Sequence, residues 1–368
     1  MQASVQTDRS PSFALLRWYD SHARSLPWRS PPGAAPPDPY RVWLSEVMLQ
    51  QTTVAAVQPY FARFVERWPD VAALAAAGEA DVMAAWAGLG YYSRARNLIA
   101  CAREVARIGA FPDDEAGLRA LPGLGAYTAA AVAAIAYDRR AVVVDANVER
   151  VVARLFAIAE PLPGSRGAIR AAAATITPDT RAGDFAQAMM DLGATICTTR
   201  NPRCLLCPLR GDCRAEALGV ADTLPAKAPK KAKPQRTGHV WWIERDGAVW
   251  LVRRPGKGML GGMRALPDDG WTARADGHGQ PPFAGPWRKG GVVRHGFTHF
   301  DLDLQLMLCE GDDMVHLSSE RGPTEIWPTE IWSGEYWPLE AIEAAGLPTV
   351  FAKAARIAIA TREERREG

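Results

Sequence analysis

The chain has 368 residues, with 43 Lys or Arg against 41 Asp or Glu, so its formal net charge is only +2. With 48% hydrophobic residues, 23% charged residues and 13 Trp, the composition excludes a disordered or low-complexity chain. The length predicts two domains. The longest apolar run is too short to cross a bilayer, and the first residues lack the pattern of an export signal. We therefore expect no membrane partner and a cytoplasmic location.

Residues 12–217 have the pattern of helices. Ala, Leu, Arg and Glu are frequent, apolar residues recur at helical intervals, and the pattern breaks at Gly and Pro turns such as 88–90 and 121–125. We therefore predict an all-α domain over residues 12–217.

One carboxylate stands in an apolar helical segment near the start of this domain. Glu46 lies in 42–52, where a helix surrounds it with Trp43, Val47 and Leu49. It lies either on the solvated face of the helix or in a desolvated position that favours the protonated form, as a general acid requires. The neighbouring residues alone do not decide between these alternatives.

Two Gly-rich turns follow in the chain. Tyr91 and Tyr92 come after the turn at 88–90, where packing against that turn accounts for both. Gly123 and Gly125 precede an Ala-rich segment; glycine adopts positive φ readily, and such a turn exposes backbone N–H groups that bind phosphate. Taken alone, the second pattern is more often a tight turn between helices.

A second carboxylate, Asp145, ends the apolar run 142–144. The helix expected to continue through Arg150 needs an N-cap, and an Asp at this position commonly serves as one. Capping is therefore the leading interpretation of Asp145 from its local sequence.

Four of the six cysteines lie within 197–213, with the spacing C-x6-C-x2-C-x5-C. Pro202 and Pro208 introduce turns that let the four sulfurs converge on one centre. Such a group in a cytosolic protein indicates a metal site before a disulfide. The ligand count alone fits both zinc and a [4Fe-4S] cluster. The four residues are Cys197, Cys204, Cys207 and Cys213.

The composition changes after the cysteines. Residues 218–237 are rich in Pro and Lys, which predicts a solvated basic linker. Beyond it, 239–245 and 248–253 flank Asp-Gly, a strong hairpin signal, and 302–308 alternates as a strand does. With a helix expected over 350–362, we predict a smaller α+β domain over residues 238–362.

In order and spacing, these features resemble the helix-hairpin-helix glycosylases of the endonuclease III superfamily. Four stretches closely resemble the MutY-type adenine DNA glycosylases, and the similarity extends over nearly the whole chain: 43–52, 88–97, 121–128 and 185–213. The resemblance implies a base excision repair hydrolase that removes adenine mispaired with 8-oxoguanine or guanine in double-stranded DNA. It also implies a [4Fe-4S] cluster on the four cysteines, with a structural role.

The resemblance assigns catalytic roles to four residues. Glu46 is expected to protonate the adenine at N7, and Asp145 to stabilise the positive charge that develops on the sugar. Asn147 is expected to orient this site. Tyr127 occupies the position at which the superfamily's lyases carry Lys, and tyrosine forms no Schiff base, so we expect base removal without efficient strand cleavage.

Other residues are expected to contact the DNA. By the resemblance, Gly123 and Gly125 bind the backbone, Gln50 and Tyr91 hold open the gap left by the extruded base, and the remaining residues form the adenine pocket. The substrate-binding residues of this domain are Trp28, Arg29, Gln50, Tyr91 and Gln187.

The C-terminal domain resembles the Nudix fold. Phe297, Thr298 and His299 match the loop that reads 8-oxoguanine in MutY-type enzymes, with Thr where Ser is usual; taken alone, His299 is more simply a strand-end residue. Residues 261–269 lack the Arg-Glu pair and further acids that hold magnesium in Nudix hydrolases, so we expect no nucleotide hydrolysis.

Three other functions compete with this interpretation. An endonuclease III-type lyase is opposed by Tyr127 and by the additional C-terminal domain. A non-catalytic DNA-binding iron-sulfur protein would not need both Glu46 and Asp145, and a Nudix hydrolase would need metal-binding acids. We expect a monomer, found near the nucleoid in a bacterium, whose linker offers contacts to other repair proteins.

Overall fold

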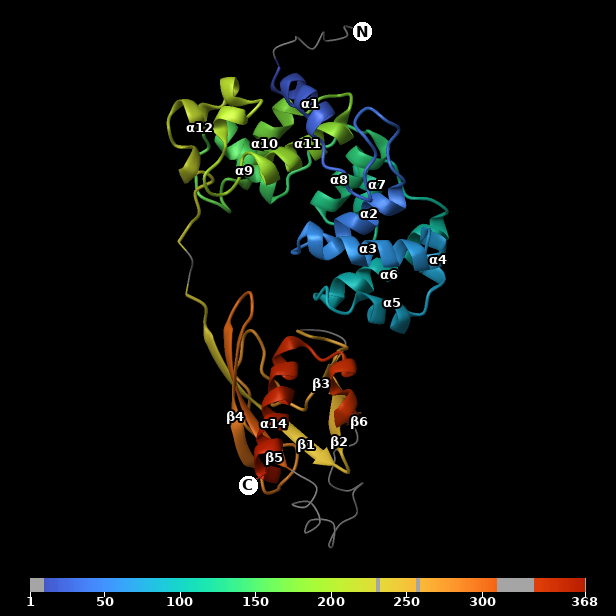
Figure 1. The fold of residues 1–368 in the computed structure, drawn as a ribbon, viewed down its shortest axis with the longest axis vertical. Helices are drawn as coiled ribbons and strands as arrows, with labels where there is room; N and C mark the ends of the chain where they lie inside the picture. The colour runs from blue at the N-terminus through green and yellow to red at the C-terminus, as the bar shows by residue number, and fades with distance from the viewer. Residues whose placement is uncertain (1–9, 230–231, 256–258, 310–333, 368) are drawn as a thin grey trace. The chain divides into compact units, whose positions relative to one another are not determined.

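The computed structural model describes residues 10–229, 232–255, 259–309 and 334–367 (Figure 1). The chain forms two compact units, residues 1–229 and 230–368. The first unit is helical and the second combines a sheet with helix, which confirms the predicted fold classes. Lys230 and Lys231, which belong to the predicted linker, lie outside the described residues.

The helical unit opens with one helix and continues through a series of short helices joined by tight turns. Polar N-caps begin many of them; Ser10 caps the first helix and Asp38 the second. The helices are α1 (Pro11–His22), α2 (Pro39–Met48), α3 (Val54–Arg67), α4 (Val71–Ala76), α5 (Glu79–Trp86), α6 (Tyr92–Ile108), α7 (Glu115–Ala120), α8 (Ala126–Tyr137), α9 (Ala146–Leu155), α10 (Arg166–Ile176), α11 (Ala182–Thr195) and α12 (Arg214–Ala217).

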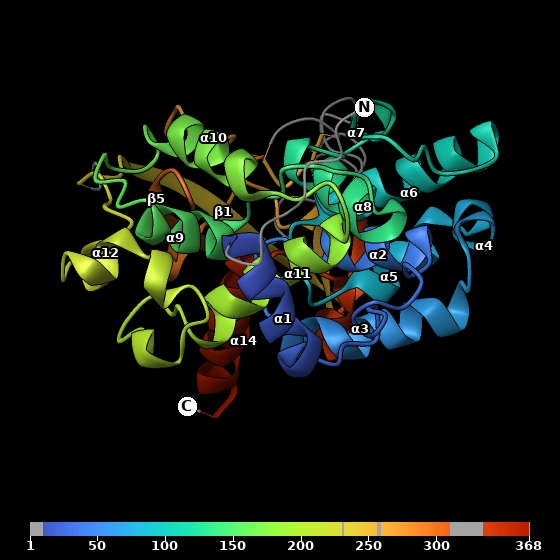
Figure 2. The same ribbon diagram turned by 90° about the horizontal axis from the view of Figure 1, so that it is seen from above.

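Helix α8 is the centre of this unit. Every residue from Thr128 to Ala136 is buried, because small Ala side chains let neighbouring helices approach from several sides. Helices α2, α7 and α11 pack against it. Helix α1 joins α9–α12 by packing on α11, while α2–α7 form the other lobe (Figures 1 and 2). The segment that connects α8 to α9 therefore lies between the two lobes.

The second unit has a mixed sheet with the strand order β3-β2-β1-β5-β4, and β6 pairs with β2. Strands β1 and β5 run parallel, and the other pairs are antiparallel. Helix α14 packs on β4, β1 and β5 (Figure 1). The elements are β1 (Gln235–Arg245), β2 (Ala248–Arg253), β3 (Arg264–Ala265), β4 (Arg288–Gly296), β5 (Asp301–Cys309), β6 (Gly334–Pro338), the 3-10 helix η4 (Leu339–Ala345) and α14 (Thr349–Glu367).

The predicted hairpin and strand are both present. Asp246 and Gly247, with φ of 49° and 74°, form the two-residue turn between β1 and β2, as a primed turn requires. On β5, Leu302, Leu304 and their alternate successors are buried in the core beneath α14, which is the reason for the alternation in the sequence.

The predicted linker, residues 218–237, makes more contacts than its composition indicates. Leu162 donates its N–H to Ala226 O (2.8 Å) and accepts from Ala228 N (3.1 Å), so this stretch pairs with the helical unit. At the other end, Gln235 already belongs to β1. Proline favours extended backbone, and here the extended stretch uses its backbone groups to pair with Leu162.

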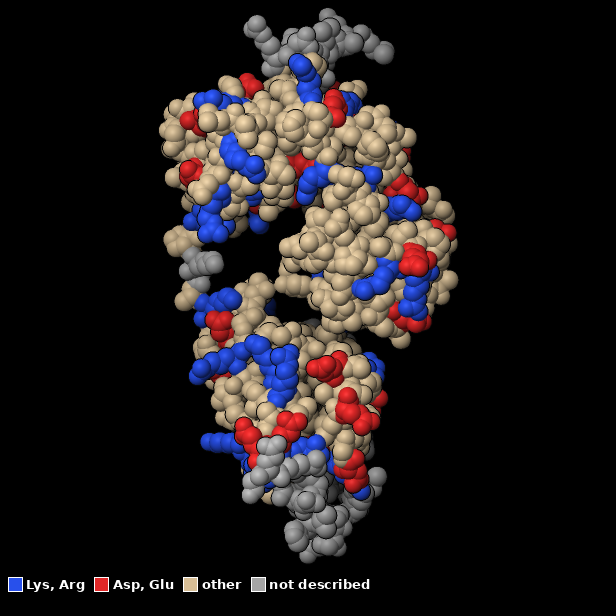
Figure 3. All heavy atoms as spheres, in the orientation of Figure 1, with Lys and Arg blue, Asp and Glu red and all other residues tan. Residues whose placement is uncertain are grey.

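The surface charge agrees with the small net charge. Basic and acidic side chains alternate over the face shown in Figure 3, without one large field of either sign. Within the described residues, none of the helices combines the length and the hydropathy that crossing a bilayer demands.

Candidate active site

A cavity of about 830 Å³ opens in the helical unit, with walls from α2, α8, α9, α11 and the segment before α2. It brings together most of the catalytic and DNA-contacting residues that the sequence indicated in this unit, although they are far apart in the chain. Tyr91 does not belong to this lining. The predicted residues around the cavity are Trp28, Arg29, Glu46, Gln50, Gly123, Gly125, Tyr127, Asp145, Asn147 and Gln187.

Glu46 lies in the cavity wall on α2 and is 6% exposed, so its placement on a solvated helix face is wrong. Burial raises the pKa of its carboxyl to about 7, because the charged form loses water, and the nearby negative charge of Asp145 adds to the rise. The Tyr127 hydroxyl donates to Glu46 Oε2 at 2.7 Å and partly opposes it. A substantial fraction of the Glu46 carboxyl is therefore protonated near neutral pH.

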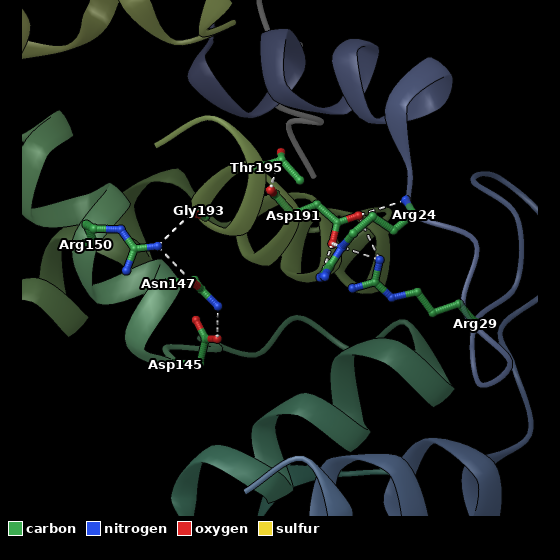
Figure 4. A network of polar contacts seen from close by, with 8 residues as sticks. All are labelled: Arg24, Arg29, Asp145, Asn147, Arg150, Asp191, Gly193 and Thr195. Carbon is green, nitrogen blue, oxygen red and sulfur yellow. Dashed lines mark hydrogen bonds and ion pairs between the residues drawn. The ribbon is translucent and has the colours of Figure 1, made fainter. Parts of the chain in front are cut away.

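Asp145 caps α9 and also faces the cavity, so the local interpretation as an N-cap is correct. Its Oδ1 accepts from Val148 N at 2.7 Å. Its Oδ2 accepts from Asn147 Nδ2 at 2.9 Å, as Figure 4 shows. Both carboxylate oxygens are therefore held by donors, which fixes the direction in which the group faces the cavity.

Arg150 holds Asn147 in turn, a role that motif reasoning missed. Its Nη2 donates to Asn147 Oδ1 (2.8 Å) and to Gly193 O (2.6 Å), as Figure 4 shows, and its Nε donates to Cys197 O (2.7 Å). The only signal in the sequence is that Arg150 follows Asn147 by three residues, one turn along α9. This arrangement links the start of α9 to the end of α11 and to the cysteine loop.

A buried ion-pair network forms another wall. Asp191 on α11 is fully buried and accepts from Arg24 Nε at 2.6 Å and from Arg29 Nη1 at 2.8 Å (Figure 4). Since two guanidinium groups share one carboxylate, this side of the cavity keeps a net positive charge. Arg24 and Asp191 were not among the predicted residues, because 167 residues separate them.

Gln187 lies one turn before Asp191 on α11 and is 4% exposed. Its Nε2 donates to Gly183 O at 3.3 Å, but no donor among the described residues reaches its Oε1. A buried acceptor without a partner is unfavourable by about 1–3 kcal/mol, so this oxygen favours a ligand that donates an N–H.

The two Gly-rich turns differ from expectation. The side chain of Tyr91 is 52% exposed, so packing against the turn does not explain why a tyrosine stands there. Its φ of 48° places it in the left-handed region.

In the second turn, Gly123 has a φ of 77°, as predicted, but Gly125 has a φ of −81° and the expectation of positive φ is wrong there. Gly125 is instead the extended N-cap of α8 and, as a glycine, offers no capping side chain. The first N–H groups of a helix have no partner within the helix, and such groups can bind a phosphate.

The four cysteines lie together as free thiols around one small cavity, with Arg154 at its edge. Arg154 Nη1 donates to Cys197 Sγ at 3.2 Å and to Thr198 O at 2.7 Å. Within the described ranges, no group of three Cys, His, Asp or Glu side chains has the arrangement of a metal site. Four thiols around one cavity are a donor set that fits a [4Fe-4S] cluster and a zinc ion alike.

The loop between β4 and β5 carries the residues predicted in the second unit. Phe297 is half-buried and stacks on Phe300, with ring centroids 4.7 Å apart, whereas Thr298 and His299 are exposed. The two acids at the end of 261–269 have structural partners: Asp268 pairs with Arg254, and Asp269 with His239.

The helical fold, the cavity with its two carboxylates and the cysteine loop define a DNA glycosylase of the helix-hairpin-helix class. Residues 44–172 match the HhH-GPD superfamily of base excision DNA repair proteins, and residues 239–356 match the NUDIX domain. A solved structure, that of a thermostable thymine-DNA glycosylase, matches with a TM-score of 0.50 and 28% identity over 56% of this chain and 95% of its own.

Relatives with higher sequence identity show which family within this class the chain belongs to. The adenine DNA glycosylase of Mycolicibacterium smegmatis is 45% identical over 244 residues, covering 65% of this chain and 82% of that protein. The human adenine DNA glycosylase is 34% identical over 362 residues, covering 80% of this chain and 65% of its own length. The chain belongs to the adenine DNA glycosylase family, which confirms the resemblance noted in the sequence.

Proposed function

We propose that the chain hydrolyses the N-glycosidic bond of adenine opposite 8-oxoguanine, or opposite guanine, in double-stranded DNA. The observation that carries this proposal is Glu46, a buried carboxyl with a pKa of about 7 that lies in one cavity with Asp145. A general acid works best when its pKa lies near the operating pH.

The hydrogen-bonding groups of adenine match those that line the cavity. The exocyclic amine of adenine is a donor, and Gln187 Oε1 is a buried acceptor that lacks one within the described structure. Trp28 and Arg29 line the same cavity and border the bound base. A base with a carbonyl in place of this amine would leave Gln187 unsatisfied, which disfavours it.

The two carboxylates have different roles in the reaction. Glu46 donates its proton to adenine N7, which makes the base a better leaving group, while Asp145 stabilises the positive charge that develops on the sugar. Asn147 orients Asp145 through the 2.9 Å hydrogen bond. Tyr127 orients Glu46 and supplies no amine, so water is the final nucleophile and strand cleavage is inefficient.

The pH dependence of excision follows from the Glu46 pKa. Only the protonated form donates, so the single-turnover rate constant is expected to be level below pH 7 and to fall about tenfold per pH unit above it. The check is excision from an adenine:8-oxoguanine duplex with enzyme in excess, alongside duplex binding at each pH. A rate that stays level up to pH 9 would exclude Glu46 as the acid.

The two Gly-rich turns, 88–90 and 121–125, contribute to DNA binding. Gln50 and Tyr91 fill and wedge the gap left by the extruded adenine, while Gly123, Gly125 and the start of α8 bind the backbone. The exposure of Tyr91 and the glycine cap of α8, which has no side chain to cover the helix start, support these roles. The enzyme acts as a monomer in the cytoplasm, at the nucleoid in a bacterium.

Cys197, Cys204, Cys207 and Cys213 bind a [4Fe-4S] cluster, which supplies a cross-link within the loop and takes no part in the chemistry. Arg154 donates to Cys197 Sγ and so helps to position this sulfur. The loop, 197–213, is thereby fixed beside the end of α11.

Substrate selection belongs to the second domain, residues 238–362, which follows a catalytic domain over 12–217 and a linker over 218–237. Phe297, Thr298 and His299 read the 8-oxoguanine, so a normal A:T pair lacks this second recognition event. The domain hydrolyses no nucleotide, and its linker offers contacts to other repair proteins.

Substitution in this loop is expected to change specificity more than activity. Thr298→Ala removes an exposed hydroxyl and should lower the preference for adenine opposite 8-oxoguanine over adenine opposite guanine by about 3–10-fold, the value of one hydrogen bond. Thr298→Ser keeps the hydroxyl and is the matched control. The measurement is the ratio of single-turnover rates at subsaturating enzyme, and an unchanged ratio in Thr298→Ala removes this residue from recognition.

The proposal as a whole is tested by single-turnover excision read with and without alkali. The substrates are duplexes that carry adenine opposite 8-oxoguanine, a normal A:T pair, or thymine glycol. Strand breaks that appear only after alkali, on the first duplex alone, support the proposal. Breaks without alkali on the thymine-glycol duplex would indicate a lyase, and no breaks on any duplex would indicate a binding protein.

A further inference from the structure

Arg94, on the first turns of α6, bridges two segments that carry proposed DNA-contacting residues. Its Nη1 donates to Val47 O (3.0 Å) and Met48 O (3.1 Å), the carbonyls at the end of α2. Its Nη2 donates to Leu89 O (3.1 Å) in the turn before Tyr91. One planar guanidinium therefore fixes the distance between the end of α2 and this turn.

The end of α2 leads directly to Gln50. The last carbonyls of a helix lack partners within the helix, and a cation there is favoured by the helix dipole. Gln51 has a φ of 59°, so the chain turns sharply after Gln50, whose Nε2 donates to Thr128 Oγ1 at 3.3 Å. The position of Gln50 thus depends on how the end of α2 is held.

The other segment ends at Tyr91, whose backbone is left-handed and whose side chain is half exposed. A non-Gly residue keeps this conformation only when its surroundings enforce it. The guanidinium of Arg94 lies 5.4 Å from the ring centroid of Tyr91 and 5.4 Å from that of Trp86. Trp86 Nε1 also donates to Gly90 O at 3.0 Å, so the turn is held from both sides.

We propose that Arg94 is a positioning residue that sets the spacing between Gln50 and Tyr91 and thereby controls extrusion of the adenine. Its side chain does not line the cavity that contains Glu46 and Asp145, although it bonds to the carbonyl of Val47, the residue after Glu46. The inference rests on the proposed function, which assigns Gln50 and Tyr91 to the gap in the duplex. It predicts that loss of Arg94 impairs extrusion and spares bond cleavage once the base is extruded.

The test compares two duplexes that differ in the free energy needed to extrude the adenine from the base stack. One has adenine opposite 8-oxoguanine, and the other has adenine opposite a tetrahydrofuran abasic analogue, where the unpaired base leaves the stack more easily. Single-turnover excision is measured on both, and 2-aminopurine beside the target reports extrusion by stopped-flow fluorescence. Thermal unfolding verifies that each variant is folded.

Arg94→Ala is expected to slow excision and the fluorescence rise about 10-fold or more on the first duplex, and about 2-fold or less on the second. Arg94→Lys keeps the charge but cannot bridge both segments, so it should show the same selectivity with a smaller loss. Arg107→Ala is the matched control, because Arg107 lies on the same helix with 70% of its side chain exposed. The effect of Arg94→Ala should not add to that of Tyr91→Ala.

Equal losses on the two duplexes, or an unchanged fluorescence rise, would overturn the positioning role. If Arg94→Ala does not fold, Arg94→Lys decides by the same comparison. If the wild-type protein excises adenine from neither duplex, the proposed function fails and the role of Arg94 in extrusion fails with it, whereas equal losses in a variant of an active enzyme overturn the role of Arg94 alone.

Discussion

Glu46→Gln is expected to lower the single-turnover rate of adenine excision by about 10²–10⁴-fold, the usual contribution of a general acid, and to leave duplex binding intact. The amide has the shape of the carboxyl and its oxygen can still accept the hydrogen bond from the Tyr127 hydroxyl, but its N–H groups are not acidic enough to transfer a proton to the base. The buried site already favours the neutral form, so the substitution should not destabilise the fold. Excision is measured with enzyme in excess at pH 6 and pH 9.

Comparing the excision rates at pH 6 and pH 9 distinguishes the loss of a catalytic acid from a structural defect. The residual activity of Glu46→Gln should no longer depend on pH near 7, because the group responsible is absent. Glu79→Gln, at the exposed start of α5, is the matched control and should behave as the wild type. A variant that keeps the wild-type rate, or that loses binding as much as excision, contradicts the role of Glu46 as the acid.

Local patterns predicted much of the fold, because the cause of those patterns is itself local. The Asp-Gly pair has the backbone freedom that a two-residue hairpin needs, and the alternation of 302–308 reflects burial of one strand face under α14. Asp145 was expected to cap a helix, and it does so while facing the cavity. The catalytic role proposed for Asp145 rests on the family resemblance, because an Asp that caps a helix and an Asp that also acts in catalysis look alike in the local sequence.

Long-range polar contacts were not predictable in the same way. The network of Arg24, Arg29 and Asp191 joins the segment before α2 to α11, and no spacing rule connects residues so far apart. Arg94 and Arg150 likewise bond mainly to backbone carbonyls, and every residue type supplies a carbonyl. Gly125 was misjudged because glycine permits positive φ without requiring it, and the N-cap position of α8 needs extended backbone instead.

Asp145→Asn is expected to lower excision by about 10³-fold, comparable to the loss of a dedicated electrostatic stabiliser. The negative charge that favours the developing sugar cation disappears. The amide also supplies one acceptor where the carboxylate supplies two, so it cannot satisfy both Val148 N and Asn147 Nδ2. Asp114→Asn, the cap of α7 with a 2.8 Å bond to Gly117 N, is the matched control and should keep full activity.

The same substitution should change the pH dependence of whatever activity remains. Asp145 contributes to the raised pKa of Glu46 through the repulsion of two negative charges, so its neutralisation lowers that pKa. Glu46 then loses its proton at a lower pH, and the decline in the residual rate should begin at more acidic pH than in the wild type. If the rate still declines around pH 7 in this variant, the charge of Asp145 does not affect the pKa of Glu46. The two carboxylates would then act independently.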